Sequence, residues 1–273
     1  MIHYSILDPI GNITALAESA VPAADQPEIA AELMRKHPEV EQVGFVRFSD
    51  LPDDPVPVEL RMAGGEFRGN ASVCAAALYL IAKGTGYDGA PVNVRLHVSG
   101  TSGPVEVSLR QEKKNAFSAV IDHPHALSIS DTDLCFRELS DRLPVVCMGG
   151  ITHIIIGPDS VFFCLQEDRP AVEEALRSWC RLLSADCLGM IFLAPDGEAL
   201  RLTPFVYVPG SGTFFRENSC ASGSAAAAMV LAAKRGIPVS LTFHEPGGTL
   251  RAECDPVSGQ TLLSIRTRLL LRI

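Results

Sequence analysis

Two segments of the chain repeat one local pattern. The first, at residues 66–80, reads EFRGNASVCAAALYL, and the second, at residues 218–231, reads NSCASGSAAAAMVL. Each passes from a small polar turn with a glycine into an alanine-rich apolar stretch, and Arg68 and Cys220 fall at the matching position. Helices that are apolar on all sides are usually buried. The repeat predicts two similar α/β lobes, each wrapped around a central helix, with chance similarity between two alanine-rich helices as the alternative.

The rest of the sequence favours many short strands and few helices. At 273 residues the chain is long enough to bury a substantial core. Helices are expected at 27–37, where a proline opens the first turn, and at 172–183, which Asp168-Arg169-Pro170 introduces. Strand-like runs lie at 56–62, 92–98, 105–109, 118–121, 153–156, 190–194, 202–208, 241–243 and 262–270.

Charge and hydropathy exclude several kinds of partner. The formal net charge of -9 argues against nucleic acid or an anionic membrane. The first residues lack a basic start, and Asp8 and Pro9 interrupt the apolar pattern, so no signal peptide is expected. The longest apolar run, at 221–233, is too short to cross a bilayer. We therefore expect a cytoplasmic protein.

No motif for a metal, nucleotide or flavin is present, and no cofactor is expected. The eight cysteines form no C-x-x-C pair, which favours reduced, mostly buried thiols. His244 and Glu245 run into Pro-Gly-Gly and indicate a turn at a strand end rather than a zinc helix. His123 and His125 flank a proline and are expected to be exposed loop residues.

Cys220 is the exception among the cysteines. It directly precedes the second alanine-rich helix, where unpaired amides and the positive end of the helix dipole stabilise a thiolate. A lowered thiol pKa is therefore expected. Asn218 and Ser219 are plausible caps of this helix, and the amides of residues 222–224 could bind a carboxylate.

Arg68 occupies the same position in the first repeat. An arginine stays protonated in proteins, so it cannot act as a general base, but it can anchor a carboxylate. The alternative is a solvated or salt-bridged arginine in a vestigial site. Gly69, which follows, allows close backbone approach, and Asn70 can donate and accept hydrogen bonds.

Five motifs together span nearly the whole chain. They read PIGN at 9–12, EFRGNA at 66–71, MGGITH at 148–153, ENSCASGS at 217–224 and EPGGTL at 245–250. In order and spacing they resemble the diaminopimelate epimerase superfamily. EQVGF at 41–45, GEFRGNA at 65–71, LTPFVYVP at 202–209 and ENSCASG at 217–223 look most like its histidine racemase branch, which serves opine-type metallophore biosynthesis.

The resemblance implies an α/β (α+β) fold of the diaminopimelate epimerase type, with two pseudo-symmetric lobes that are each a β-barrel-like sheet around a central helix. We expect an N-terminal lobe at 1–125, completed by the C-terminal strand at 260–273, and a C-terminal lobe at 126–259. In active members of this superfamily, one cysteine from each lobe flanks the substrate Cα, and no pyridoxal phosphate takes part. The substrate is expected between the two helix N-termini.

Carried over by motif, the resemblance assigns roles to individual residues. Cys220 matches the catalytic cysteine of the second lobe, and Arg68 stands where the first-lobe cysteine is expected. Cys74 lies about 9 Å further along the helix axis and is expected to be a core residue. The expected substrate-binding residues are Asn12, Glu41, Gly69, Asn70, Glu217, Ala221, Ser222 and Gly223.

The sequence thus predicts a cofactor-independent amino-acid racemase or epimerase that abstracts an α-proton with Cys220, from histidine or a related amino acid. Arg68 keeps three alternatives open. One is α-deprotonation on one face, leading to elimination or a proton shift, and another is a relative that binds an amino acid without catalysis. The third is an accidental arginine in an ordinary racemase. A homodimer would fit the family.

Overall fold

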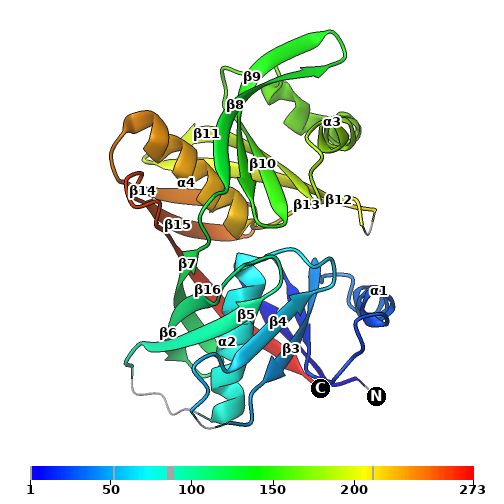
Figure 1. Cartoon of the computed structure of the whole chain (residues 1–273), viewed down its shortest axis with the longest axis vertical. Coiled ribbons are helices and arrows are strands. Elements are labelled where there is room, and N and C mark those ends of the chain that lie inside the picture. Colours follow the sequence, from blue (N-terminus) through cyan, green and yellow to red (C-terminus); the bar gives the residue numbers. More distant parts are fainter. Residues whose placement is uncertain (1, 52, 85–88, 211) are drawn as a thin grey trace. The chain divides into compact units, whose positions relative to one another are not determined.

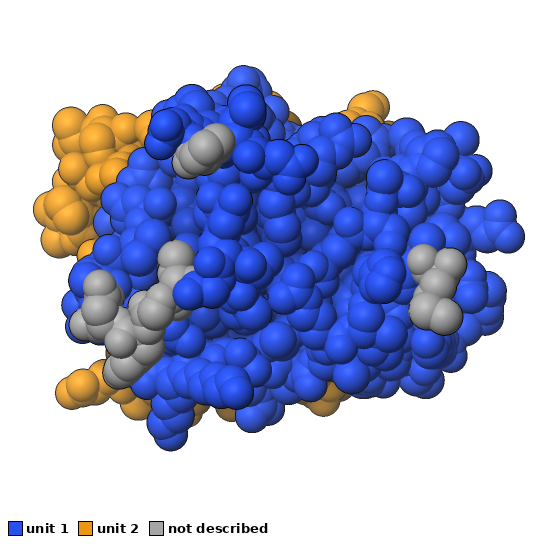
Figure 2. Space-filling view, turned by 90° about the horizontal axis from the view of Figure 1, so that it is seen from below, with its two compact units in different colours: residues 1–123, 262–273 blue, residues 124–261 orange. Residues whose placement is uncertain are grey.

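The computed structural model describes residues 2–51, 53–84, 89–210 and 212–273. They divide into two compact α+β units, of residues 1–123 with 262–273 (unit 1) and of residues 124–261 (unit 2), which are blue and orange in Figure 2. No helix among the described residues is long and apolar enough to span a membrane.

Unit 1 contains a closed barrel of eight strands. Neighbours pair in the order β1 to β7, then β16, and β16 closes the ring by pairing with β1, as in Ser5 opposite Arg272. The pairs β2–β3 and β4–β5 are parallel, and the links between them carry helices α1 (Gln26–Lys36) and α2 (Gly69–Lys83). The strands are β1 (Tyr4–Asp8), β2 (Thr14–Ala17), β3 (Gln42–Phe48), β4 (Val58–Met62), β5 (Val92–Val98), β6 (Val105–Lys113), β7 (Ala116–His123) and β16 (Thr261–Arg272).

Helix α2 runs inside this barrel, and it contacts strands β1 to β7 (Figure 1). Its alanines make the helix thin enough for strands to pack around it, while Val73 and Leu78 are fully buried. Each such aliphatic side chain contributes about 1.5–3 kcal/mol on burial. The helix begins after Arg68 and ends at Gly84, whose left-handed conformation (φ 64°) closes its last turn.

Unit 2 repeats this plan with an open sheet. Its strands pair in the order β15-β14-β12-β11-β10-β9-β8, with β13 beside β12. The pairs β10–β11 and β12–β14 are parallel, and helices α3 (Arg169–Leu182) and α4 (Ala221–Arg235) connect them, as α1 and α2 do in unit 1. The strands are β8 (Ser128–Phe136), β9 (Leu139–Met148), β10 (Ile151–Ile156), β11 (Leu188–Asp196), β12 (Ala199–Val208), β13 (Thr213–Arg216), β14 (Val239–Glu245) and β15 (Gly248–Cys254).

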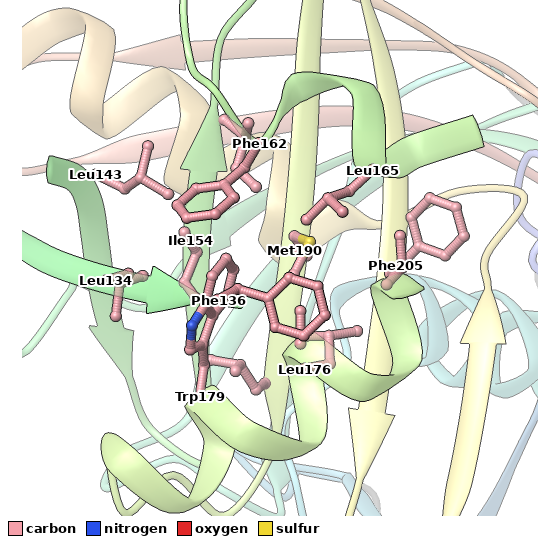
Figure 3. Close-up of a cluster of buried hydrophobic side chains, with 14 of the residues drawn as sticks. Leu134, Phe136, Leu143, Ile154, Phe162, Leu165, Leu176, Trp179, Met190 and Phe205 are labelled. Atoms are coloured by element: carbon pink, nitrogen blue, oxygen red, sulfur yellow. The ribbon is translucent and has the colours of Figure 1, made fainter. Parts of the chain in front are cut away.

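The two faces of the unit 2 sheet hold different helices. Leu188, Met190 and Phe192 of β11 join the cluster around Trp179 of α3, which Figure 3 shows. Ile191 lies between them in sequence and faces α4, since side chains alternate along a strand. Helix α4 contacts β9, β10, β11, β14 and β15, and its alanines are as buried as those of α2. The face of the sheet that α4 covers carries the candidate site residues of unit 2.

The structure confirms most of the predicted elements. Every expected strand and helix overlaps an observed one, usually with one to four more residues at an end. The second lobe was expected to be barrel-like, and this is wrong for the described residues, where no pairing joins β8 to β15. The reason lies in β8, whose first six residues are mostly exposed and include Asp131 and Asp133, so it has little apolar surface to bury.

The prediction for His123 is also wrong. This residue ends β7 and is 1% exposed, because its ring packs edge-on against Phe67 with 5.0 Å between ring centres. His125 is exposed, as expected. The neighbouring proline suggested a loop at His123, but it is equally compatible with the last residue of a buried strand.

Candidate functional site

Cys220 is the N-cap residue of α4. Its backbone is extended (φ -133°, ψ 94°), it is 3% exposed, and no side chain of the cap residue itself closes the helix. The Cys220 amide instead donates to Glu245 Oε2 at 2.7 Å, and the Ser224 hydroxyl donates to Glu245 Oε1. The expectation that Asn218 or Ser219 caps α4 is therefore wrong, because a carboxylate from the end of β14 takes that role.

Burial dominates the protonation of Glu245. Its carboxyl group lies in the interior of unit 2, and this desolvation raises its pKa from 4.5 to about 7. The hydrogen bonds from the Ser224 and Ser219 hydroxyls and from the Cys220 amide oppose the rise, while the nearby charge of Glu217 adds to it. Glu245 therefore changes its charge near neutral pH, next to the cysteine that the sequence singled out.

Ser222 links Cys220 to a buried histidine. The Ser222 hydroxyl lies 2.9 Å from His153 Nε2 and 3.7 Å from Cys220 Sγ. His153 comes from β10 and is fully buried. A side chain at Gly189, opposite His153 on β11, would clash with the imidazole, so a glycine is required there. The first turn of α4 thus rests on a polar contact with the sheet beneath it.

The other predicted residues of unit 2 lie in the same turn or just before it. Ala221, Ser222 and Gly223 are the first three residues of α4, and their amides lie at its positive end. A Cβ on Gly223 would sit 2.5 Å from Ile191 Cδ1 and 3.1 Å from Cys220 Sγ, so the glycine allows the helix to approach β11. Glu217 is buried, and its amide donates to the Pro204 carbonyl oxygen.

Arg68 is the N-cap residue of α2 and is buried in a way that its charge alone would not predict. Its side chain is 10% exposed, and Nε donates to Glu66 Oε1 at 3.0 Å. Buried charges in proteins are normally paired. The interpretation of Arg68 as a solvated residue is therefore wrong, and that of a salt-bridged residue agrees with the contact to Glu66.

Three further predicted residues form a hydrogen-bonded chain at the start of α2. Asn12 Nδ2 donates to Glu41 Oε2 at 2.6 Å, and Asn70 Nδ2 donates to Asn12 Oδ1 at 3.3 Å. Asn12 follows β1, Glu41 precedes β3, and Asn70 is the second residue of α2, after Gly69. Side chains that are 29 and 58 residues apart thus converge on one helix N-terminus.

The remaining cysteines separate into structural and exposed thiols. Cys74 is fully buried inside the barrel against Thr267, and burial raises its pKa to about 12, which confirms its expected place in the core. All eight cysteines are reduced, and five are buried, among them Cys220. No group of three or more His, Cys, Asp or Glu side chains in the described part of the chain is arranged to hold a metal ion.

Sequence reasoning missed Glu245 and His153 as members of this cluster. Both stand in motifs quoted for the resemblance, but a glutamate before Pro-Gly-Gly reads as part of a turn, and a histidine within an isoleucine-rich strand reads as core. Each of these two residues is the single ionisable residue at an inward-facing position of its strand. That pattern could have identified them, since a buried ionisable group needs a buried partner.

Comparison with known proteins points in one direction. Residues 1–268 match the family model described as the histidine racemase CntK N-terminal domain. A histidine racemase of Fusobacterium nucleatum subsp. nucleatum is 29% identical over 233 residues, which cover 83% of this chain and 79% of the relative. A histidine racemase of Staphylococcus aureus is 27% identical over 252 residues, which cover 92% and 87%.

Solved structures share the fold at lower identity. A hydroxyproline epimerase from Agrobacterium vitis, with bound trans-4-hydroxy-L-proline, superposes with a TM-score of 0.68 at 13% identity, over 98% of this chain and 90% of the other. A phenazine biosynthesis PhzF family protein from Enterococcus faecalis gives 0.61 at 15% identity, over 100% and 98%. These likenesses concern the fold, which is that of proline racemase and PhzF-type proteins.

Proposed function

Because the chain belongs to the histidine racemase CntK N-terminal domain family, we propose that it is an amino-acid racemase or epimerase that uses no cofactor and acts on histidine or a related amino acid. The relatives named histidine racemase support this substrate class. The observation that carries the proposal is the position of Cys220, a buried thiol on the N-cap residue of α4.

The proposed reaction starts with removal of the α-proton. An amino-acid α-C–H is a very weak acid, so the carbanion must be stabilised by the protein. Cys220, as thiolate, takes the proton, and the amides of residues 221–223 at the start of α4 hold the α-carboxylate. A donor on the opposite face of Cα then delivers a proton and completes the inversion. Cys220 is left as a thiol and the donor has lost its proton, so both groups must exchange protons with water to regenerate the starting form.

The polar chain of unit 1 supplies recognition in this proposal. Glu41, held by Asn12, is a carboxylate suited to an ammonium or imidazole group, and Asn70 extends the same chain with an amide. Glu217 of unit 2 is a second candidate for the substrate amine. Arg68, fixed by Glu66, anchors an anionic group rather than moving a proton.

A second candidate is deprotonation on one face, which leads to elimination or a proton shift. The observation that favours it is the same arginine, since a guanidinium paired with Glu66 accepts no proton where the resemblance expects the second cysteine. Loss of one acid or base commonly costs about 10²–10⁴-fold in rate.

The proposed function also includes a further likeness to diaminopimelate epimerase, a role in metallophore biosynthesis and a cytoplasmic location.

Exchange in D₂O tests both candidates. The purified protein is incubated with L- and D-histidine and a panel of other amino acids, with α-deuterium read by mass spectrometry and configuration by chiral chromatography. We expect deuterium together with inversion for histidine, and loss of both in Cys220→Ser. Cys164→Ser, at an exposed cysteine, is the matched control. Deuterium with retained configuration would favour the one-sided reaction, and no exchange of any amino acid would refute catalysis.

A further inference from the structure

The start of α4 is capped from a distance. The acceptor for the Cys220 amide is Glu245, which lies 25 residues further along the chain at the last position of β14. The turn after β14 is itself tied to the segment before α4, because the Gly247 amide donates to the Asn218 carbonyl oxygen at 2.8 Å. Strand β14 and the first turn of α4 therefore form one hydrogen-bonded unit around Cys220.

The other end of the Glu245 carboxyl group is also held. Its Oε1 accepts from the hydroxyl of Ser224, one turn into α4. With both oxygens bound, the carboxyl group has a single orientation, and it is 7% exposed. Its nearer oxygen lies 2.7 Å from the Cys220 amide nitrogen. Since N and Sγ of one cysteine are three covalent bonds apart, that oxygen lies within about 7 Å of Sγ.

Unit 1 offers a matched comparison for this arrangement. Strand β5 corresponds to β14 in strand order and length, so Val98 occupies the position of Glu245. The hydroxyl of the next residue, Ser99, accepts a hydrogen bond from the Met62 amide and donates one to the Glu66 carbonyl oxygen. The turn that follows β5 thus supports the start of α2 with a neutral hydroxyl. A carboxyl group stands at this place in the unit whose N-cap residue is a cysteine.

We propose that Glu245 is a positioning residue for Cys220: by accepting the hydrogen bond of the Cys220 amide, its carboxyl group fixes the cysteine at the start of α4 and sets the pH at which the thiol ionises. A negative charge here opposes thiolate formation and offsets part of the effect of the helix dipole. The inference rests on the proposed function for the catalytic meaning of Cys220, but the electrostatic relation between the two residues does not depend on it.

Other groups also act on Glu245. The Ser219 hydroxyl lowers its pKa, as the Ser224 hydroxyl and the Cys220 amide do, while the charge of Glu217, in the segment after β13, raises it. Across β15 the register places Gly248 opposite Glu245, and on β12 Arg201 lies opposite the neighbouring His244, whose side chain points to solvent. On β10, His153 contacts Ser222. The carboxyl group of Glu245 is hydrogen-bonded directly to Cys220, whose ionisation it sets in this proposal.

The test measures how readily Cys220 ionises in the folded protein. Short pulses of iodoacetamide are applied across the pH range in which thiols titrate, and alkylation of the Cys220 peptide is read by mass spectrometry. Glu245→Gln keeps an acceptor for the Cys220 amide but removes the charge. We expect its alkylation midpoint to fall by about one pH unit or more. Glu253→Gln, at an exposed glutamate of β15, should leave the midpoint unchanged.

A second variant guards against loss of the fold in Glu245→Gln. Ser224→Ala removes a hydrogen bond that lowers the Glu245 pKa, so Glu245 stays neutral to higher pH and the Cys220 midpoint should shift in the same direction by a smaller amount. An unchanged midpoint in the folded variants, or a Cys220 that stays unreactive in all of them, would overturn the proposal. Absence of amino-acid exchange in the unaltered protein would instead count against the proposed function alone.

Discussion

The first turns of α2 and α4 differ most in the charge placed at their N-cap residues. Each helix is alanine-rich, buried and preceded by an extended N-cap residue, with φ of -134° at Arg68 and -133° at Cys220. At α2 the cap residue is a cation paired with Glu66, and at α4 it is a thiol whose amide is bound by Glu245. The same backbone therefore carries a paired cation in one unit and, in the other, a thiol whose amide is bound by a carboxyl group.

The largest expected effect comes from making the two N-cap residues alike. Arg68→Cys places a thiol at the start of α2, where the helix dipole favours its ionised form. Inversion of histidine should rise by about 10²-fold or more, because the variant then has a thiol at both N-cap residues, as the proposed racemisation requires. Chiral chromatography measures it, with Arg142→Cys at an exposed site as control. An unchanged rate would mean that the first unit is specialised for other chemistry.

The buried carboxyl group of unit 2 should make stability depend on pH. The pKa of Glu245 is raised from 4.5 to about 7 in the folded protein, so the folded state holds this proton more tightly than the unfolded state. That contribution is complete below pH 4.5 and is lost as pH rises through 7. Relative to Glu245→Gln, the free energy of unfolding of the parent protein should fall by about 3 kcal/mol over this range.

Urea denaturation at a series of pH values measures this difference. Using the difference between parent and variant removes the titration of all other groups, provided that they titrate alike in both proteins. Parallel curves would show that water or a shifted side chain already relieves the burial of Glu245. The N-cap residues of α2 and α4 would then no longer differ by a buried, titrating carboxyl group next to α4.

The next largest effect is expected when the ion pair between Glu66 and Arg68 in unit 1 is broken. Glu66→Gln removes the carboxylate that accepts from Arg68 Nε in a buried setting, which should lower the free energy of unfolding by about 2–3 kcal/mol. Glu59→Gln, which alters an exposed pair with Arg47, should change it by less than about 1 kcal/mol. Equal effects of the two substitutions would contradict a structural role for the Glu66–Arg68 pair.

The smallest effect is expected at Ser222. Ser222→Ala removes the hydroxyl that lies 2.9 Å from His153 Nε2, and a hydrogen bond of this kind is worth about 1 kcal/mol. Thermal unfolding should report that loss, while the exposed Ser240→Ala should report close to none. Because Ser222 also lies near Cys220 Sγ, a loss of exchange activity larger than the loss of stability would assign it a part in proton transfer.

Local sequence was sufficient for several features of the fold. The alternating and aliphatic runs predicted strands such as β5, with its exact bounds, and Asp168-Arg169-Pro170 predicted the start of α3, where Asp168 caps the helix through the Ala171 amide. Strands β1 to β3 escaped prediction, since short buried runs look alike in helices and strands. The polar hairpin of β8 and β9 gave no apolar pattern at its exposed end.

The candidate site residues were likewise predictable only where they are defined by local sequence. The repeated motif located Arg68 and Cys220 at the starts of two buried helices, because a helix N-terminus is a local feature of the chain. It did not identify the residues that surround them. The contact of Glu245 with the Cys220 amide spans 25 residues, and that of His153 with Ser222 spans 69.

By itself, the sequence determined which residues begin α2 and α4 and which family the chain resembles, since helix starts and motif order are written in consecutive residues. The tertiary structure decided what those residues meet: a cation with its carboxylate at Arg68, and a buried carboxyl group at Cys220. The physical reason is that burial and hydrogen bonding set the charge of an ionisable group, and these depend on strands that are distant in sequence and adjacent only after folding.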